Sequence, residues 1–258
     1  MNGIDFKNIL VEMNGGELGN EEYFTFGAVN DEITKIVVSW CVDDETVDFA
    51  IKNKCNFILH HESLLHPYPI WSALERNYLG WKVNADKLAR LGANKINTFR
   101  LHCTMDKLTI YKTFAEKLGL RKVRDGRGIY DAVFSSQFAT AGELAAHAKK
   151  VMNMPSIRFA GNPDQKISNI GLAFGGIGLF VNVGSVQKMI ENGADVIIAG
   201  ESDNMGFRFC TEQNIPVIEL SHEVTENPGI KVFCDELQKK IPSVEVLFFE
   251  NKQVWQAI

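Results

Sequence analysis

The sequence at residues 56–63 reads NFILHHES, an apolar run that ends abruptly in two adjacent histidines. Because this run is short, apolar and preceded by the polar turn 52–54, it predicts a buried β-strand. Successive side chains of a strand point to opposite faces, so His60 and His61 can serve one site only if the chain bends just past the strand. In open α/β sheets, ligand sites form at that place, outside the carboxyl ends of the strands.

The segment before this strand predicts a β-α-β unit. Residues 35–41, KIVVSWC, are rich in β-branched side chains and predict a strand. Asp43 and Asp44 then predict the N-cap and first turn of a helix that runs through Ile51. A strand, a helix and a second strand in this order predict two parallel, adjacent strands.

Strands and helices continue to alternate along the chain, except in a middle segment that has a different pattern. A short helix at 4–13 comes first, and the helical stretch 71–92, the strand 95–101 and the helix 107–118 follow the β-α-β unit. In the middle segment, 121–165, strand-like pieces near 129–135 and 156–160 flank a helix at 140–151 with the capping box Thr140 and Glu143. Four later strands (167–174, 194–199, 215–220, 244–249) alternate with three helices (182–192, 203–213, 227–240). This order predicts an α/β fold.

The repeated alternation predicts two similar α/β halves, each a sheet flanked by helices, that face each other across a cleft. We expect the halves to be residues 1–125 and 126–258, or one intertwined domain in which the N- and C-terminal parts pack together. No linker of low complexity marks a boundary between the halves.

Composition and charge narrow the class of protein. The chain has 258 residues, of which 45% are hydrophobic and 23% charged, as in ordinary soluble globular proteins. A net charge of −5 argues against nucleic acid as the main partner. The N-terminus has no signal-peptide pattern, and no apolar run is long enough to span a membrane. The five cysteines are scattered, odd in number and form no Cys-x-x-Cys, which predicts reduced thiols in a cytoplasm.

Polar side chains follow the predicted strands where each strand ends. They are His60, His61, His102, Asp106, Glu201, Asp203, His222 and Glu226. Four of the six histidines of the chain belong to this set. Imidazole and carboxylate are the ligands of zinc, iron, manganese and nickel, and a carboxylate can bridge two ions about 3.5–4 Å apart. The sequence therefore predicts a metal site.

The geometry of His222 and Glu226 has two interpretations. If the segment is helical throughout, their i, i+4 spacing puts both side chains on one face. If Thr225 is the N-cap and Pro228 lies in the first turn, Glu226 instead sits at the helix start, where an anion is favoured. Both interpretations let the two side chains converge.

Two further motifs have structural interpretations that we favour. The loop 175–178, GGIG, follows a strand and precedes a helix, so its N–H groups can approach a phosphate. It lacks the dinucleotide fingerprint, which favours a tight turn. Cys103 lies between His102 and Asp106; we expect a small packing residue rather than a reactive thiol.

Taken together, four motifs resemble those of the Nif-three-like family of dinuclear-metal proteins, which includes type 2 GTP cyclohydrolase I homologues. The resemblance runs in order from about Lys35 to Phe249. The motifs are ILHH at 58–61 with Pro67 after it, LHCTMD at 101–106, GADV at 193–196 leading to Gly200-Glu201, and SHEVTENPG at 221–229. The second is similar to the family's His-Thr-Asn-Leu-Asp, and the fourth to its His-x-x-x-Glu-x-x-Gly.

The resemblance implies a site for two divalent metal ions. By matched position its protein ligands are His60, His61, Asp106, His222 and Glu226, with Glu226 as the bridge between the ions. It also implies two α/β halves and a ring-shaped homohexamer. With only some forty residues between the halves, this chain resembles the short form of the family.

The chain departs from the family around the expected ligands. Residues 202–205 read SDNM where the family often has a Lys-His-His-Asp-like run, and Glu62 stands where the family usually has proline. The ligand set is intact, whereas the groups that surround it differ.

We therefore expect a cytoplasmic, metal-dependent hydrolase of the GTP cyclohydrolase I type 2 kind, acting on a nucleotide or a cyclic amide. Glu201, His102 and Glu62 are the expected proton-transfer groups. The alternative is a non-catalytic metal-binding scaffold or metal chaperone that binds a protein partner. A third hypothesis, nucleic-acid binding through the hole of the ring, is disfavoured by the acidic charge balance.

Overall fold

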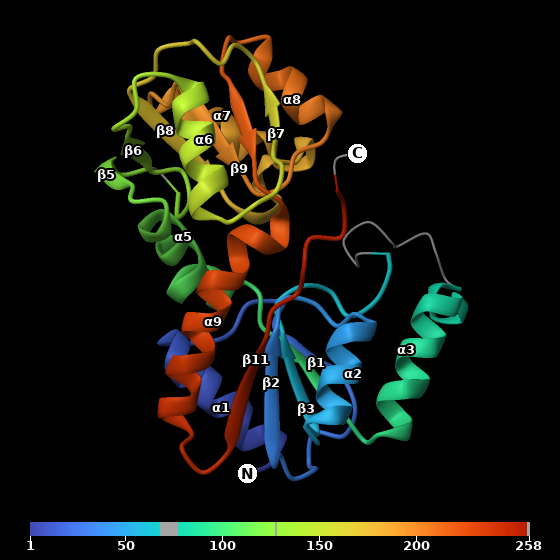
Figure 1. Ribbon diagram of the computed structural model, residues 1–258. Helices are drawn as coiled ribbons and strands as arrows, with labels where there is room; N and C mark the ends of the chain where they lie inside the picture. Colours follow the sequence, from blue (N-terminus) through green and yellow to red (C-terminus); the bar gives the residue numbers. More distant parts are fainter. Residues whose placement is uncertain (68–76, 127, 257–258) are drawn as a thin grey trace. The chain divides into compact units, whose positions relative to one another are not determined.

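The computed structural model describes residues 1–67, 77–126 and 128–256, and the chain divides into two compact units (Figure 1). Unit 1 contains Met1–Thr109 and Ile230–Asn251, and unit 2 contains Ile110–Gly229 and Lys252–Ile258. The division thus differs from the expected boundary between residues 125 and 126. The reason is that the last strand of the chain completes the sheet of unit 1. No helix in the described ranges is both long and apolar enough to cross a membrane.

Unit 1 is built on a five-stranded sheet in the order β1-β4-β3-β2-β11. Its strands are β1 (Tyr23–Phe26), β2 (Lys35–Ser39), β3 (Phe57–His60), β4 (Asn97–Arg100) and β11 (Glu245–Phe249). β1 is antiparallel to β4, and the other neighbours are parallel. The parallel pairing of β2 with β3 confirms the predicted β-α-β unit. Ser39 pairs with His60 and His60 with Arg100, so the carboxyl ends of these three strands lie at one edge.

Local signals in the sequence place the helices of unit 1. They are α1 (Gly3–Asn14), α2 (Asp44–Lys52), η2 (Tyr78–Gly80), α3 (Lys82–Ala93) and the later part of α9 (His222–Lys240). As predicted, Asp43 caps α2 by accepting a hydrogen bond from the Thr46 N–H at 2.7 Å. Gly15 ends α1 in the left-handed conformation. Of the predicted helical stretch 71–92, residues 71–76 lie outside the described residues.

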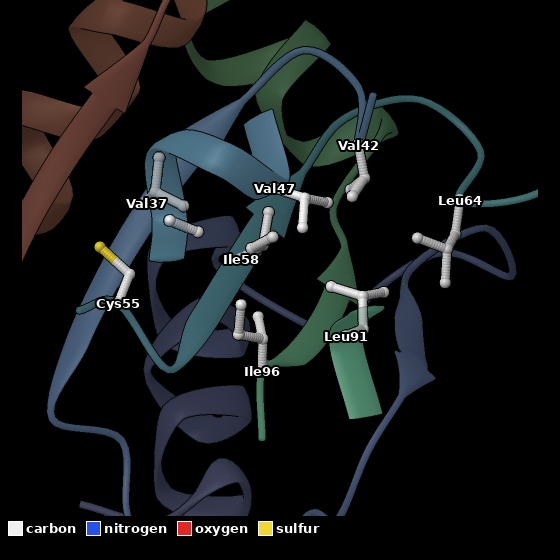
Figure 2. Packing of buried hydrophobic residues seen from close by; sticks show 9 residues of the cluster. Val37, Val42, Val47, Cys55, Ile58, Leu64, Leu91 and Ile96 are labelled. Carbon is white, nitrogen blue, oxygen red and sulfur yellow. The ribbon is translucent and has the colours of Figure 1, made fainter. Parts of the chain in front are cut away.

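The core of unit 1 covers both faces of the sheet. On one face Val37 and Ile58 belong to the apolar cluster of Figure 2, together with Val47 of α2 and Leu91 of α3. On the other face the Phe57 ring packs edge-on against Phe6 of α1, with the ring centroids 5.1 Å apart. Because helices cover both faces, all residues of β3 are buried and the strand is a continuous apolar run.

The chain after β4 forms an irregular helical run. Its parts are α4 (Cys103–Met105), the π turn η3 (Asp106–Ile110) and α5 (Tyr111–Lys117). The helical run therefore begins at Cys103, earlier than the predicted start at residue 107. Gly119 ends the run as expected, with a φ of +70°. A π turn inserts an extra residue into a helical turn and is frequent at functional sites.

Unit 2 is built on a six-stranded sheet in the order β5-β6-β8-β9-β10-β7. Its strands are β5 (Arg121–Arg124), β6 (Val133–Ser135), β7 (Arg158–Ala160), β8 (Asn169–Ala173), β9 (Val196–Ala199) and β10 (Val217–Glu219). β8, β9 and β10 are parallel, and the remaining neighbours are antiparallel. The sequence did not predict β5, because this edge strand is fully exposed and reads RKVR, without an alternating apolar pattern.

The helices of unit 2 largely follow the predictions. They are α6 (Ala141–Val151), η4 (Gly175–Gly178), η5 (Phe180–Asn182), α7 (Val183–Glu191), α8 (Asn204–Thr211) and the first part of α9. Thr140 caps α6 as predicted. Met189 of α7 and Cys210 of α8 pack in one buried cluster with Ile197 of the sheet. The helix α9 begins at His222, five residues before the predicted start, and Pro228 lies inside it.

A buried asparagine holds the carboxyl edge of the unit 1 sheet together. The Asn251 amide donates to Oδ2 of Asp43 at 2.9 Å and to Oγ1 of Thr46 at 3.1 Å. Its oxygen accepts from the Trp40 N–H at 3.0 Å and from the Cys41 N–H at 3.4 Å. The Asn251→Ala variant removes all these partners at once. We expect its free energy of unfolding to fall by about 3 kcal/mol, because several buried groups lose their hydrogen bonds.

Urea denaturation followed by far-ultraviolet circular dichroism measures this change. Lys252→Ala, at the exposed neighbouring position, is the matched control and should lie within about 0.5 kcal/mol of the wild type. A loss below about 1 kcal/mol in Asn251→Ala would contradict the structural role of this side chain.

Candidate metal centre

His60, the last residue of β3, is fully buried and both of its ring nitrogens have protein partners. Nδ1 donates to the Glu62 carbonyl at 2.7 Å, and Nε2 lies 2.8 Å from Oγ1 of Thr25. Burial, against the opposing effect of the Glu62 hydrogen bond, lowers the pKa of His60 to about 3. The ring is therefore neutral, and its Nε2 lone pair is directed at the Thr25 hydroxyl. A metal ion at this nitrogen has to replace that hydroxyl.

His61 and Asp106 form a buried imidazole–carboxylate pair. His61 follows β3 and Asp106 opens the π turn η3, and both side chains are buried. Nε2 of His61 lies 3.6 Å from Oδ1 of Asp106. The Arg100 Nε donates to the His61 carbonyl at 3.1 Å, which holds the histidine backbone against the end of β4. His61 and Asp106 thus come together as predicted, from two neighbouring strand ends.

His102 completes a three-residue group with this pair. Possible ligand atoms of His61, His102 and Asp106 all lie within 4.8 Å of one another. The His102 ring stacks on the His61 ring, with centroids 4.4 Å apart and planes 30° apart. Burial lowers the pKa of His102, but hydrogen bonds with Cys103 and Glu21 and the nearby carboxylates outweigh it and raise that pKa to about 11.

In unit 2, His222 and Glu226 form a second imidazole–carboxylate pair. They lie four residues apart in α9, which is helical from His222 onward, so the first interpretation of their geometry is confirmed. Nε2 of His222 lies 3.4 Å from Oε1 of Glu226, and Nδ1 lies 3.1 Å from Oε2 of Glu201. A carboxylate that accepts from Nδ1 leaves the Nε2 lone pair on the side of Glu226. Thr225 donates to the His222 carbonyl at 2.8 Å and is not an N-cap.

The glycine turn after β8 leaves room for this second pair. A Cβ at Gly175 would lie 1.9 Å from Oε1 of Glu226 and 3.0 Å from Nε2 of His222. The Gly175 N–H donates to Oγ1 of Thr225 at 3.1 Å, and its carbonyl accepts from the Glu201 N–H at 2.8 Å. The loop 175–178 is thus a tight turn, as favoured from the sequence, and its first glycine borders the predicted ligands.

The segment that carries Glu201 is held by an ion pair between the exposed Arg158 and the buried Glu219. Oε2 of Glu219 accepts from the Ser202 N–H at 3.0 Å, and the Arg158 guanidinium donates to the Ser202 carbonyl at 2.9 Å. Arg158 and Glu219 also bond to each other, with Nε 2.8 Å from Oε1. Desolvation raises the pKa of the fully buried Glu219, and the Arg158 guanidinium opposes this shift. Neither residue was predicted from the sequence, because Arg158 on β7 and Glu219 on β10 belong to no motif.

Two expectations for individual residues are corrected. Cys103 is exposed, so it is not a packing residue. Its place before the buried Thr104 at the start of α4 turns its side chain outward. Asp203, in the departure segment 202–205, is the N-cap of α8 and accepts from the Met205 and Gly206 N–H groups. Its carboxylate is therefore used for folding.

Glu21 was not among the residues predicted for the site either. This side chain accepts from Nδ1 of His102 at 2.9 Å and lies 3.5 Å from the Arg100 guanidinium. It falls in the segment 17–34, which has no periodicity. The only local signal for it is two consecutive acidic residues just before β1.

The two imidazole–carboxylate pairs fit divalent metal ions. Their nitrogen–oxygen separations are 3.6 and 3.4 Å, longer than the hydrogen-bond range of about 2.7–3.2 Å. Two ligands that each lie about 2.1 Å from a tetrahedral ion are roughly 3.4 Å apart. The donor types also match, because imidazole nitrogen with carboxylate oxygen suits zinc, iron and manganese.

Comparison with known proteins identifies the family. A profile of the Duf34/NIF3 (NGG1p interacting factor 3) family matches residues 23–254. The chain belongs to the Duf34/NIF3 family. This confirms the resemblance that the His-His, His-x-x-x-Asp and His-x-x-x-Glu motifs carry.

Two curated relatives of this Duf34/NIF3 protein bear the same name. A protein of Neisseria meningitidis serogroup B, named GTP cyclohydrolase 1 type 2 homolog, is 25% identical over 224 residues. That alignment covers 85% of this chain and 84% of the relative. A protein of the same name from Clostridium acetobutylicum is 27% identical over 209 residues, which are 75% of this chain and 72% of the relative.

Two solved structures share the fold of this chain. A Bacillus cereus protein related to NIF3 superposes with a TM-score of 0.81 at 14% identity and covers 100% of this chain and 99% of its own. Staphylococcus aureus protein SA1388 superposes with a TM-score of 0.79 at 17% identity and the same coverage. These likenesses confirm the predicted α/β fold with two sheets flanked by helices.

Proposed function

We propose that this Duf34/NIF3 protein binds two divalent metal ions and acts as a metal-dependent hydrolase on a nucleotide or a cyclic amide. The observation that carries the proposal is the spacing of its two imidazole–carboxylate pairs. His61 with Asp106, and His222 with Glu226, lie 3.6 and 3.4 Å apart, which suits ligands of one ion better than a hydrogen bond. The names of the curated relatives support a cyclohydrolase-type reaction.

The metal identity proposed is zinc, iron, manganese or nickel, which accept this donor set. Motif order along the chain, rather than a measured separation, supports one dinuclear centre with Glu226 as the bridge. His60 is the fifth ligand in this proposal, and its binding requires the Thr25 hydroxyl to give up Nε2. The proposal also includes a homohexamer. It further includes a cytoplasmic location, which the lack of disulfide bonds among the described cysteines supports.

Residues of this chain would hold and move the protons of the reaction. When bound, divalent ions supply Lewis acidity that makes water a nucleophile near neutral pH. Glu201 keeps the Nδ1 proton of His222 in place, so that Nε2 remains a ligand. Nε2 of His102 lies 3.7 Å from Oε1 of Glu62, and these two side chains are the proposed proton donor and acceptor for the substrate.

Metal analysis of the purified protein tests the metal part of the proposal. We expect two ions per chain in the wild type, and less than one in both His61→Ala and Glu226→Gln, because a bridged centre loses affinity for both ions together. The exposed His66→Ala and Glu212→Gln are matched controls and should retain two ions. Fewer than one ion per chain in the wild type contradicts the metal site.

Loss of only one ion in each ligand variant would contradict the single centre.

Turnover is measured on a panel of nucleotides and cyclic amides with and without added metal. A hydrolase should release product only with metal present, and should lose at least about 100-fold of its rate in Glu226→Gln.

A non-catalytic metal-binding scaffold is the second candidate. The use of Asp203 as the N-cap of α8 favours it, since the segment 202–205 then offers no proton-transfer side chain. This candidate predicts two ions per chain without turnover on any member of the panel, together with a stable protein partner in pull-down experiments.

A further inference from the structure

Another set of side chains that could hold a metal ion lies in unit 1, and it shares His102 with the group His61, His102 and Asp106. Possible ligand atoms of Glu21, His102 and Cys103 all lie within 4.8 Å of one another. Nδ1 of His102 is 2.9 Å from Oε2 of Glu21 and 3.8 Å from Sγ of Cys103. The set thus offers one oxygen, one nitrogen and one sulfur atom.

Buried hydrogen bonds between the neighbouring residues hold this cluster in place. Glu22, next to Glu21, accepts from the Thr104 N–H at 2.6 Å and from the Thr104 hydroxyl at 3.0 Å. Glu22 is 5% exposed and Thr104 is 1% exposed, so this contact is shielded from water. It clamps the loop before β1 to the first turn of α4. Glu21 directly precedes Glu22, and Cys103 directly precedes Thr104. The contact between Glu22 and Thr104 therefore brings Glu21 and Cys103 close together.

The donor types select a class of metal. A thiolate with imidazole and carboxylate suits zinc, and likewise cobalt, whereas magnesium and calcium take oxygen ligands. Three protein ligands with one position left for solvent form a common zinc arrangement. Cys103 is exposed, so an ion can reach it from solution. Cys55, Cys210 and Cys234 are buried, and burial raises the pKa of each to about 11, which keeps them as thiols.

We propose that Glu21, His102 and Cys103 form an accessory binding site for a thiophilic divalent ion, and that this ion is zinc. The site is separate from the His61–Asp106 and His222–Glu226 pairs. None of its three residues belongs to the proposed dinuclear ligand set. His102 is also a proposed proton-transfer residue, but the accessory site uses its Nδ1, whereas its Nε2 lies beside Glu62.

Titration of the metal-free, full-length protein with Co²⁺ under reducing conditions tests the site. Thiolate bound to Co²⁺ produces a sulfur-to-metal charge-transfer band in the near ultraviolet, which nitrogen and oxygen ligands do not produce. We expect this band in the wild type and its complete loss in Cys103→Ala. Glu21→Gln should keep the band with an affinity lowered on the order of tenfold or more. A circular dichroism spectrum shows that each variant is folded.

Two controls separate this site from the rest of the protein. Cys41→Ala removes another thiol of unit 1 and should leave the band unchanged. Glu226→Gln alters the proposed dinuclear centre and should also leave it unchanged, so failure of one proposal does not decide the other. After incubation with added Zn²⁺, zinc analysis should find one ion more in the wild type than in Cys103→Ala, beyond the two ions expected for the dinuclear centre of the purified protein. Absence of the band in the wild type, or its survival in Cys103→Ala, overturns the accessory site.

Discussion

The Gly175→Ala variant is expected to bind metal at the His222–Glu226 pair on the order of 10- to 100-fold more weakly than the wild type. The added Cβ would lie 1.9 Å from Oε1 of Glu226, so the carboxylate has to leave its place beside His222. The turn cannot retreat, because both backbone groups of Gly175 are hydrogen-bonded, one of them to Thr225. Its φ of +54° adds a further penalty for any side chain.

Isothermal titration of the metal-free protein with Zn²⁺ measures this effect. Gly184→Ala is the matched control, since a Cβ there meets no atom within 4 Å and the position lies in α7. The control should bind Zn²⁺ as the wild type does. Equal affinity of Gly175→Ala and wild type, with both proteins folded, would show that Glu226 does not hold the ion.

The Gly229→Ala variant is expected to lower the free energy of unfolding by about 2 kcal/mol or more. Alanine in a helix interior is favoured over glycine by about 1 kcal/mol, which opposes the loss. A Cβ at Gly229, however, would lie 2.3 Å from Cα of Ile110 and 2.8 Å from its nitrogen. These are backbone atoms, so no change of rotamer relieves the overlap. Overpacking of this kind costs about 3 kcal/mol, and the steric term outweighs the helix propensity.

Guanidinium chloride denaturation, with circular dichroism and tryptophan fluorescence recorded in parallel, measures this change. Gly184→Ala again provides the control. It should be unchanged or stabilised by up to about 1 kcal/mol, since it brings the same helix-propensity gain without a clash. If Gly229→Ala is as stable as the wild type, α9 does not approach Ile110 as closely as the structure places it.

Short-range patterns were sufficient for most helices and strands. Asp43 marks the start of α2 and Gly15 the end of α1, because capping depends on residues within one turn. The predicted start of α9 was wrong because Pro228 suggested a first turn. In the structure Pro228 lies inside the helix, and the preceding turns carry His222 and Glu226 against the Gly175 turn. Contacts with distant residues therefore extended this helix beyond its local signal.

The same contrast applies to the candidate site. The order of strands and the polar residues at their ends singled out His61, Asp106, His222 and Glu226, since parallel strands bring their carboxyl ends to one edge of a sheet. Nothing in the sequence singled out Glu21, which reaches His102 because β1 pairs with β4 in an antiparallel register. The polar segment before β1 has no period, so no local pattern predicts that contact.

Periodicity, caps and motif spacing are properties of neighbouring residues, and they were enough to predict the α/β class and the family. For Nε2 of His60 and Nδ1 of His102, the partner comes from a segment far away in the chain. His60 is the clearest case. Its place beside His61 suggests a ligand, yet Thr25 of β1 occupies its Nε2. The pairing of β1 with β4 brings Thr25 there, and long-range pairing of this kind follows from packing of the whole sheet rather than from adjacent residues.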